Sequence, residues 1–335
     1  MRFGKPLARL GIALLALAGL AAHAAQPVTV YSARNEQLIK PLFERFTAET
    51  GIPVRYITDK EGPLLARLKA EGRNTRADML MTVDAGNLWQ AAEQGVLAEL
   101  KSPVLDKNIP EYLRDPQGRW YGLSVRARTI VYSSERVKPE QLSTYAELAD
   151  PRWKGKLCLR TSKKVYNQSL VAMMIARLGE QKTEQVVRGW VANLAAPPFS
   201  DDTSLIKAIA AGQCDVGIVN TYYFGRLQKD DPNLPVKLFW AGQNDSGVHV
   251  NVSGAGVTRY APNPEGGRRL LEWLSTAEAQ ELFAGINLEY PANPNVPLDP
   301  QVKAWGSFKS DVINVSEAGR LQTQAVMLMD RAGYR

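Results

Sequence analysis

The chain has 335 residues, of which 45% are hydrophobic, and its formal net charge is +7 at pH 7. This length is sufficient for two lobes with separate cores, and the composition argues against a disordered chain or a coiled coil. Lys and Arg residues are scattered among Asp and Glu, so the charge is too mild to indicate a nucleic-acid partner.

The first 24 residues have the pattern of a secretory signal peptide. Arg2, Lys5 and Arg9 precede the apolar run 10–22, and residues 22–24 form a small-x-small cleavage site, Ala-His-Ala. Loss of the three basic residues leaves a net charge of +4 on the mature chain. No later stretch approaches the roughly 20 apolar residues of a membrane helix. We therefore predict an exported protein whose mature chain, from about residue 25, is not inserted into a membrane.

The first part of the mature chain alternates strands with helices. We expect strands at 28–31, 54–57 and 78–83, and apolar residues repeat at helical spacing over 38–46, 64–70 and 88–94. Such alternation predicts a parallel sheet with right-handed connections. Pro41 lies inside the first helical pattern, so this helix should begin later than its apolar residues indicate, or bend there.

A long extended run follows at 122–132 and contains Arg126 and Arg128. We interpret it as the first crossing between two lobes, because a strand shared by two sheets would explain its length. The two arginines would then face the cleft between the lobes. The alternative is an edge strand with two solvated charges.

The β/α alternation resumes in the second half of the chain. Residues 249–257, an apolar stretch with glycines, have the character of a return crossing, and two half-chains joined by extended crossings predict a two-lobed α/β protein. The remaining expected helices are 139–148, 168–178, 186–194, 205–211, 265–283 and 316–331, and the remaining strands are 157–159, 214–219 and 236–240.

The two cysteines, Cys158 and Cys214, predict one disulfide, because an exported chain folds in an oxidising compartment. A zinc site built on this pair would need two more soft or imidazole ligands. Only His249 remains after cleavage of the signal peptide, so the chain can hardly supply them.

Two adjacent phenols, Tyr222 and Tyr223, directly follow the predicted buried strand 214–219. In open α/β sheets ligands bind at the carboxyl ends of the strands, and Tyr166 lies at a second strand-to-helix junction. Three phenols without an acidic cluster favour a hard, highly charged cation such as Fe(III), which lowers the phenol pKa enough to bind phenolate near neutral pH. The alternative is that the pair is an ordinary set of half-buried aromatic residues.

Several stretches resemble one family, the periplasmic Fe(III)-binding proteins that serve bacterial ABC-type iron importers. The resemblance implies a two-lobed periplasmic-binding-protein fold of type II topology, with ferric iron in the cleft between the lobes. It also implies a periplasmic monomer that delivers iron to an ABC transporter permease. The matching stretches cover almost the whole mature chain in order: 30–34, 67–72, 77–86, 124–133, 166–170, 220–225 and 249–256.

With this fold, the predicted first lobe comprises residues 26–125 and about 256–300. The second lobe comprises about 130–253 and about 301–335. Hinge crossings are expected near 124–131 and 252–257.

By the same resemblance, the phenolate ligands of the iron are Tyr166, Tyr222 and Tyr223. Several members of the family place His and then Tyr in the first loop, where this chain has Asn35 and Glu36. An imidazole and a fourth phenol are therefore missing from the expected iron shell.

Other members without these groups complete the shell with carbonate or another small anion held by arginine. Arg34 and Arg126 resemble the residues that would hold such an anion, and planar guanidinium groups bind its oxygens in pairs. Glu36 or Glu61 could supply a carboxylate instead, and the sequence does not decide between these alternatives.

Two other functions compete with iron binding. A type II cleft could hold a small organic solute such as a sugar, thiamine, a polyamine or a phosphonate. A secreted enzyme is the third hypothesis, but the chain has no Gly-x-Ser-x-Gly, His-Glu-x-x-His or Gly-rich phosphate-binding motif. We therefore expect a binding protein and not an enzyme.

Overall fold

The structure is a computed structural model that describes Met1 and residues 25–335. Residues 2–24, which make up the predicted signal peptide after Met1, lie outside the described residues. Within the described part, none of the helices has the length and apolar character needed to cross a membrane.

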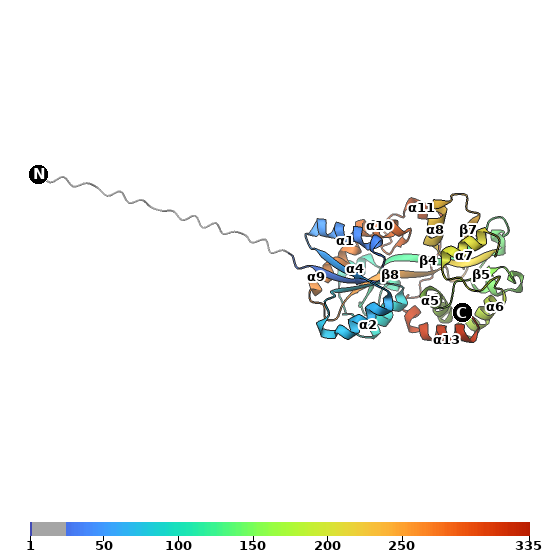
Figure 1. The fold of residues 1–335 in the computed structure, drawn as a ribbon, viewed down its shortest axis with the longest axis horizontal. Coiled ribbons are helices and arrows are strands. Elements are labelled where there is room, and N and C mark those ends of the chain that lie inside the picture. Colours follow the sequence, from blue (N-terminus) through green and yellow to red (C-terminus); the bar gives the residue numbers. More distant parts are fainter. Residues whose placement is uncertain (2–24) are drawn as a thin grey trace.

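Two lobes lie side by side, and strands β4 and β8 run from one into the other (Figure 1). In the described residues, nine strands form one sheet in the order β2-β1-β3-β8-β4-β6-β5, with β7 and β9 also paired to β4. The strands are β1 (Val28–Ser32), β2 (Val54–Thr58), β3 (Met79–Val83), β4 (Tyr121–Ser133), β5 (Leu157–Cys158), β6 (Val216–Asn220), β7 (Val236–Phe239), β8 (His249–Val257) and β9 (Tyr290–Pro291).

The crossing strands make the sheet mixed. β1 pairs in parallel with β2 and β3, and β5 pairs in parallel with β6, but β8 is antiparallel to both β3 and β4. The order β2-β1-β3-β8-β4 is that of a type II lobe. The parallel pairing predicted for the first three strands is therefore confirmed, and only the strands that join the lobes run against their neighbours.

The length of β4 follows from the strands that pair with it in both lobes. Along one edge of β4, the part up to Arg128 pairs with β8, and the part from Ile130 onward pairs with β7. Strand β6 pairs with its other edge from Arg128 to Tyr132. β4 therefore belongs to the sheets of both lobes.

Helices cover both faces of the sheet. They are α1 (Glu36–Thr50), α2 (Glu61–Glu71), α3 (Ala85–Glu93), α4 (Pro103–Asn108), α5 (Val165–Leu178), α6 (Glu180–Ala192), α7 (Asp202–Ala210), α8 (Thr221–Asp230), α9 (Pro264–Leu274), α10 (Ala277–Asn287), α11 (Pro300–Ala304), α12 (Glu317–Arg320) and α13 (Gln322–Arg331).

Helix α1 begins at Glu36 and continues through Pro41, so the expected later start is wrong. A proline inside a helix costs about 3 kcal/mol. The helix buries Ile39, Phe43 and Phe46 in the core of the first lobe, and each fully buried apolar side chain contributes about 1.5 to 3 kcal/mol. Burial of this face outweighs the cost of the proline.

Three expected helices are interrupted. The segment 139–148 contains two short 3-10 turns, Pro139–Gln141 and Ala146–Ala149, and the Thr144 hydroxyl accepts from Glu147 N at the second turn. The segment 265–283 is split into α9 and α10, because Thr276 caps α10 by accepting from Ala279 N. The segment 316–331 is divided into α12 and α13 at Leu321.

The buried apolar residues form one cluster in the first lobe and two on opposite faces of the second-lobe sheet. Val302 and Val315 belong to the first cluster, while Leu328 and Tyr334 belong to the second lobe. The chain after residue 300 therefore contributes to both lobes. The exact lobe and hinge boundaries given above remain predictions.

The predicted disulfide between Cys158 and Cys214 is confirmed. Cys158 ends β5, whereas Cys214 lies just before β6 and not within it. Since β5 and β6 pair in parallel, the bond fastens two neighbouring segments of the second lobe.

Candidate metal-binding site

Two helix N-termini of the second lobe carry the three candidate tyrosines. Tyr222 and Tyr223 lie in the first turn of α8, directly after β6, and Tyr166 lies in the first turn of α5. The sequence placed Tyr166 at a strand-to-helix junction before the expected helix 168–178, but α5 already begins at Val165. Helix N-termini carry a partial positive charge and favour anionic groups, including phenolates.

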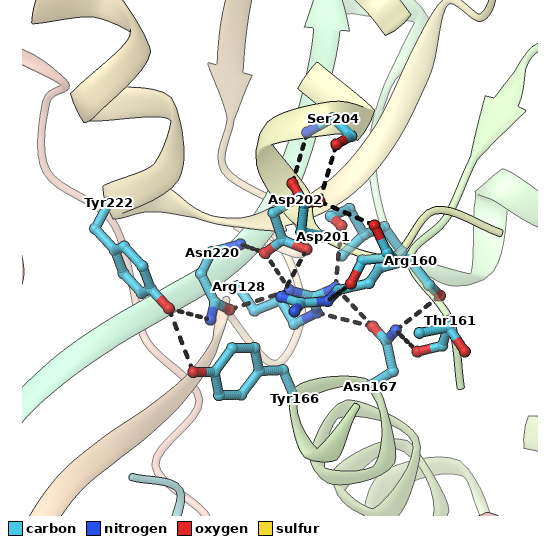
Figure 2. Close-up of polar contacts among 12 residues, drawn as sticks. Arg128, Arg160, Thr161, Tyr166, Asn167, Asp201, Asp202, Ser204, Asn220 and Tyr222 are labelled. Atoms are coloured by element: carbon cyan, nitrogen blue, oxygen red, sulfur yellow. Dashed lines mark hydrogen bonds and ion pairs between the residues drawn. The ribbon is translucent and has the colours of Figure 1, made fainter. Parts of the chain in front are cut away.

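The structure brings these tyrosines together. The hydroxyl oxygens of Tyr166 and Tyr222 face each other at 3.5 Å (Figure 2), and the ring centroids of Tyr222 and Tyr223 lie 4.4 Å apart. All three side chains line one cavity of about 200 Å³. The first lobe provides its opposite wall: Ala33, Arg34, Asn35, Leu38, Glu61, Val83, Asn287 and Glu289.

Basic side chains surround the phenol rings. The Arg126 guanidinium carbon lies 5.1 Å from the centre of the Tyr166 ring, and Lys164 Nζ lies 4.7 Å from the same ring. The Arg226 guanidinium carbon lies 5.2 Å from the Tyr222 ring. Nearby positive charge favours the ionised form of a phenol.

Burial nevertheless raises the pKa of Tyr222 well above its ordinary value, and the neighbouring Tyr166 and Tyr223 raise it further. The positive charge of Arg126 lowers this pKa only in part. The Tyr222 phenol is therefore protonated near neutral pH in the absence of a bound cation. A cation strong enough to displace this proton would convert it into an oxygen ligand.

The two predicted anion-binding arginines both line the cavity, and both are bound by protein groups. Arg34 Nη1 donates to Ser253 Oγ at 2.5 Å and lies 3.3 Å from a Glu289 carboxylate oxygen. Arg126 donates to Ser253 Oγ at 2.8 Å and to the Val252 carbonyl at 2.9 Å. In the described part of the chain, the buried Nε atoms of both arginines have no hydrogen-bond partner.

Arg126 and Arg128 are 2% and 1% exposed, so the alternative of solvated charges on an edge strand is wrong. Of these two β4 arginines, Arg126 lines the cavity and Arg128 does not. The expectation that Arg128 also faces the cleft is wrong, because this side chain is buried within the second lobe, among Asn167, Asp202 and Asn220.

Glu289 is a member of the site that sequence reasoning missed. It is buried, and its carboxylate accepts hydrogen bonds from Arg34, from the Ser124 hydroxyl and, at 2.5 Å, from Asn287 Nδ2. Burial alone would raise its pKa, but the charges of Arg34 and Arg126 and these hydrogen bonds hold the pKa below its usual range. Glu289 is thus a carboxylate that neutralises part of the arginine charge, and no local sequence pattern marks it.

The two glutamates considered as additional ligands differ in position. Glu61, at the start of α2, lines the cavity with its carboxylate 3.9 Å from Lys164 Nζ. Glu36 is exposed, accepts from the Tyr56 hydroxyl at 2.8 Å and does not line the cavity. Asn35 does line it.

Lys164 and Arg226 are further cavity residues that sequence reasoning did not select. Arg226 lies four residues after Tyr222 on α8 and donates to the Asn287 side chain across the cavity. Residues at this spacing share one face of a helix, so the spacing could have identified Arg226.

Two α/β lobes joined by extended crossing strands, with a polar cavity between them, define a two-lobed solute-binding protein. The family described as bacterial extracellular solute-binding protein matches residues 74–310, and the chain belongs to this family.

Similar proteins share this organisation over nearly their full lengths. The iron uptake protein A1 of Synechocystis is 44% identical over 92% of this chain and 88% of its own length. The structure of Trichodesmium IdiA (FutA) in complex with iron and citrate ligands superposes with a TM-score of 0.89, at 44% identity, over 92% of this chain and 100% of that chain. The Mannheimia haemolytica ferric iron-binding protein A, in an open conformation, has a TM-score of 0.88 at 37% identity over 93% of this chain and 99% of that chain.

Proposed function

We propose that this protein binds ferric iron in the periplasm through the phenolates of Tyr166, Tyr222 and Tyr223. The observation that carries the proposal is the convergence of three phenols from two helix N-termini on one cavity between the lobes. Iron uptake by the Synechocystis relative and the iron in the Trichodesmium structure support the same cargo.

The chemistry follows from charge and hardness. Fe(III) is a hard cation, and phenolate is a hard oxygen donor that binds it after losing a proton. Three phenolates balance the three positive charges of the ion. Because Tyr222 is protonated in the free protein, iron uptake releases protons and strengthens as the pH rises.

The remaining charges of the cavity favour an additional anion. Arg34, Arg126, Lys164 and Arg226 provide four positive charges, and Glu61 and Glu289 provide two negative ones, which leaves an excess of two. A dianion such as carbonate, held by Arg34 and Arg126, would cancel this excess. Their free Nε groups are donors for its oxygens.

A carboxylate of the protein is the alternative ligand. Glu61 lines the cavity and is the better placed of the two glutamates, because Glu36 is exposed and bound to Tyr56. In either arrangement the cargo passes from this protein to an ABC transporter permease. We propose a monomeric binding protein and no enzymatic activity.

A visible spectrum tests the proposal. The metal-free mature protein should be colourless, and ferric citrate should produce the visible charge-transfer band of ferric phenolate. Tyr222→Phe should abolish or shift this band. Tyr132→Phe removes a buried phenol in the core of the second lobe and is the matched control, so its band should equal that of the wild type. A wild-type protein that stays colourless would overturn the proposal in favour of an organic solute.

A further inference from the structure

We propose that Arg128 is a positioning residue that holds the two phenol-bearing helices at a fixed separation. This inference rests on the proposed function, because it assigns a role in assembling the phenolate site. Arg128 lies on β4, is 1% exposed and does not line the cavity. Two of its partners, Asn167 and Asn220, lie within two residues of the candidate iron ligands Tyr166 and Tyr222 (Figure 2). We refer to Arg128, Asn167, Asp202 and Asn220 as the Arg128 network.

The guanidinium group uses all of its donor capacity within this network and its immediate backbone. An arginine has five N–H donors. Nε and Nη2 donate to Asn167 Oδ1 at 3.1 and 2.6 Å, and Nη2 also donates to the Ile218 carbonyl at 3.1 Å. Nη1 donates to Asp202 Oδ2 at 3.0 Å and to Asn220 Oδ1 at 3.2 Å. The planar guanidinium group of Arg128 therefore joins β4 to β6, α5 and α7.

Each asparagine of the network is tied to one phenol-bearing helix. Asn167 follows Tyr166 on α5, and its Nδ2 donates to the carbonyls of Arg160 and Thr161 in the loop that leads into this helix, both at 2.9 Å. Asn220 ends β6, two residues before Tyr222. The network thus sets the position of both helix N-termini relative to β4.

The network also determines which way the Asn220 amide points. Arginine has donors and no acceptor, so the amide must turn its oxygen toward Arg128 and its nitrogen away. That nitrogen, Nδ2, lies 3.5 Å from the Tyr222 hydroxyl oxygen, at the outer limit of a hydrogen bond. Arg128 therefore acts on Tyr222 through Asn220.

Asp202 completes the network and is fully buried at the start of α7. Its Oδ2 accepts from Arg128 and from the backbone N–H of Asn220, the latter at 3.0 Å. Buried ion pairs are a poor source of stability, because the cost of removing both charges from water offsets their attraction. A positional role explains this pair better than a contribution to stability does.

Asn167, Asp202 and Asn220 lie in the second lobe, and Arg128 extends from the crossing strand β4 into the same lobe, so the network needs no contact from the first lobe. The phenol half of the site is consequently preformed before the lobes close. Preorganised ligands bind a metal without first being ordered.

The test compares Arg128→Lys with Arg136→Lys. Lysine keeps the charge beside Asp202 but loses the planar fork that holds both asparagines. Arg136, in the same lobe, binds Asp215 at 2.8 Å and the carbonyls of Ile209 and Cys214, away from the phenols. Arg128→Lys should weaken ferric iron binding about tenfold or more and shift the charge-transfer band, while Arg136→Lys should leave both unchanged.

A metal-free measurement separates this inference from the proposed function. In protein labelled with 13C in the tyrosine rings, Arg128→Lys should broaden or move the Tyr166 and Tyr222 signals, and Arg136→Lys should not. If Arg128→Lys does not fold, Asn220→Ala replaces it, because that change leaves the ion pair with Asp202 intact.

Each result has one meaning. Altered ring signals without any iron binding by the wild type would support the network and overturn the proposed function. The positioning role of Arg128 would be wrong if the variant Arg128→Lys, or Asn220→Ala in its place, had the same tyrosine ring signals, iron affinity and charge-transfer band as the wild type.

Discussion

At the scale of single residues, the cationic side of the cavity depends on one hydroxyl group. Ser253 on β8 accepts from both Arg34 and Arg126, which brings two guanidinium groups together in spite of their repulsion. Glu289 reduces this repulsion on the side of Arg34. The arginines are therefore held in position before any anion binds.

This arrangement gives a prediction about the unresolved part of the iron shell. Replacing Arg126 by Gln should weaken ferric iron binding at least about tenfold, because a bound anion loses charge-assisted hydrogen bonds of roughly 1.5 to 3 kcal/mol each. Glu61→Gln should have a much smaller effect, and Glu36→Gln, at an exposed site, is the control.

Iron titrations in carbonate-depleted buffer, with carbonate added back, measure these effects. A wild-type affinity that ignores carbonate and other small anions, combined with a collapse in Glu61→Gln, would show that a carboxylate is the missing ligand.

The candidate ligands could be predicted from sequence because the phenols follow strand ends, where local pattern and topology agree. The partners that set their environment could not. Glu289 reaches Arg34 across 255 positions of the chain, and Arg128 reaches Asp202 across 74. Such contacts exist only after the lobes have folded, so no local pattern reports them.

At the scale of elements, the disulfide fixes the start of β6 to β5. The two cysteines are 56 positions apart, and closing a loop of this size stabilises a fold by about 4 kcal/mol in the chain-entropy description. Replacing both Cys158 and Cys214 by Ala should lower the free energy of unfolding by up to this amount.

Urea unfolding of metal-free protein measures the loss, with reduced wild-type protein as a second reference. Two free thiols in the denatured, unreduced wild type would contradict the bond itself.

Strand β8 begins with a buried histidine, His249, from which we expect a dependence of stability on pH. Burial is the main reason why the pKa of His249 falls to about 3; the charge of Asp311 opposes this shift, and the charges of Arg128 and Arg126 add to it. An unfolded chain has this pKa near 6.5. Between these values the unfolded chain binds a proton that the folded chain does not, so stability is complete above pH about 6.5 and falls as the pH decreases toward 3.

The prediction is a loss of about 2 to 3 kcal/mol between pH 7 and pH 4.5 from this residue alone. His249→Gln should remove that part of the pH dependence, and urea unfolding of both proteins at the two pH values measures the difference. Equal losses in the variant and the wild type would assign the acid sensitivity to carboxylates instead. His249 is a suitable probe because it is the single histidine of residues 25–335.

Elements were predictable where apolar spacing was long and regular, as in α1 and β4. The segment 265–283 has helical spacing throughout, yet Thr276 accepts from Ala279 N and starts a second helix. A capping side chain of this kind competes with a continuous helix, and which alternative is adopted depends on packing. Strand direction was equally undetermined, because antiparallel pairing of β4 and β8 arises from the second lobe returning to the first.

At the scale of the whole molecule, a small set of polar contacts joins the two lobes around the cavity. Asp84 at the end of β3 accepts from the Ser169 hydroxyl on α5 at 2.6 Å. Lys164 approaches Glu61, and Arg226 donates to Asn287. Polar contacts of this type are each worth on the order of 1 kcal/mol, so these three stabilise the contact between the lobes only modestly.

Iron should therefore shift the balance between open and closed lobes. The phenols and the Arg128 network belong to the second lobe, while Arg34, Glu61 and Glu289 belong to the first, so a bound ion with its anion contacts both lobes only when they are closed. A ligand stabilises the state in which it makes more contacts.

Ferric iron should accordingly reduce the radius of gyration measured by small-angle X-ray scattering. Tyr222→Phe combined with Tyr223→Phe should show no such compaction, because the ion is then not held. A loaded wild-type protein, identified by its visible band, that scatters identically to the metal-free protein would place the iron outside the cavity between the lobes.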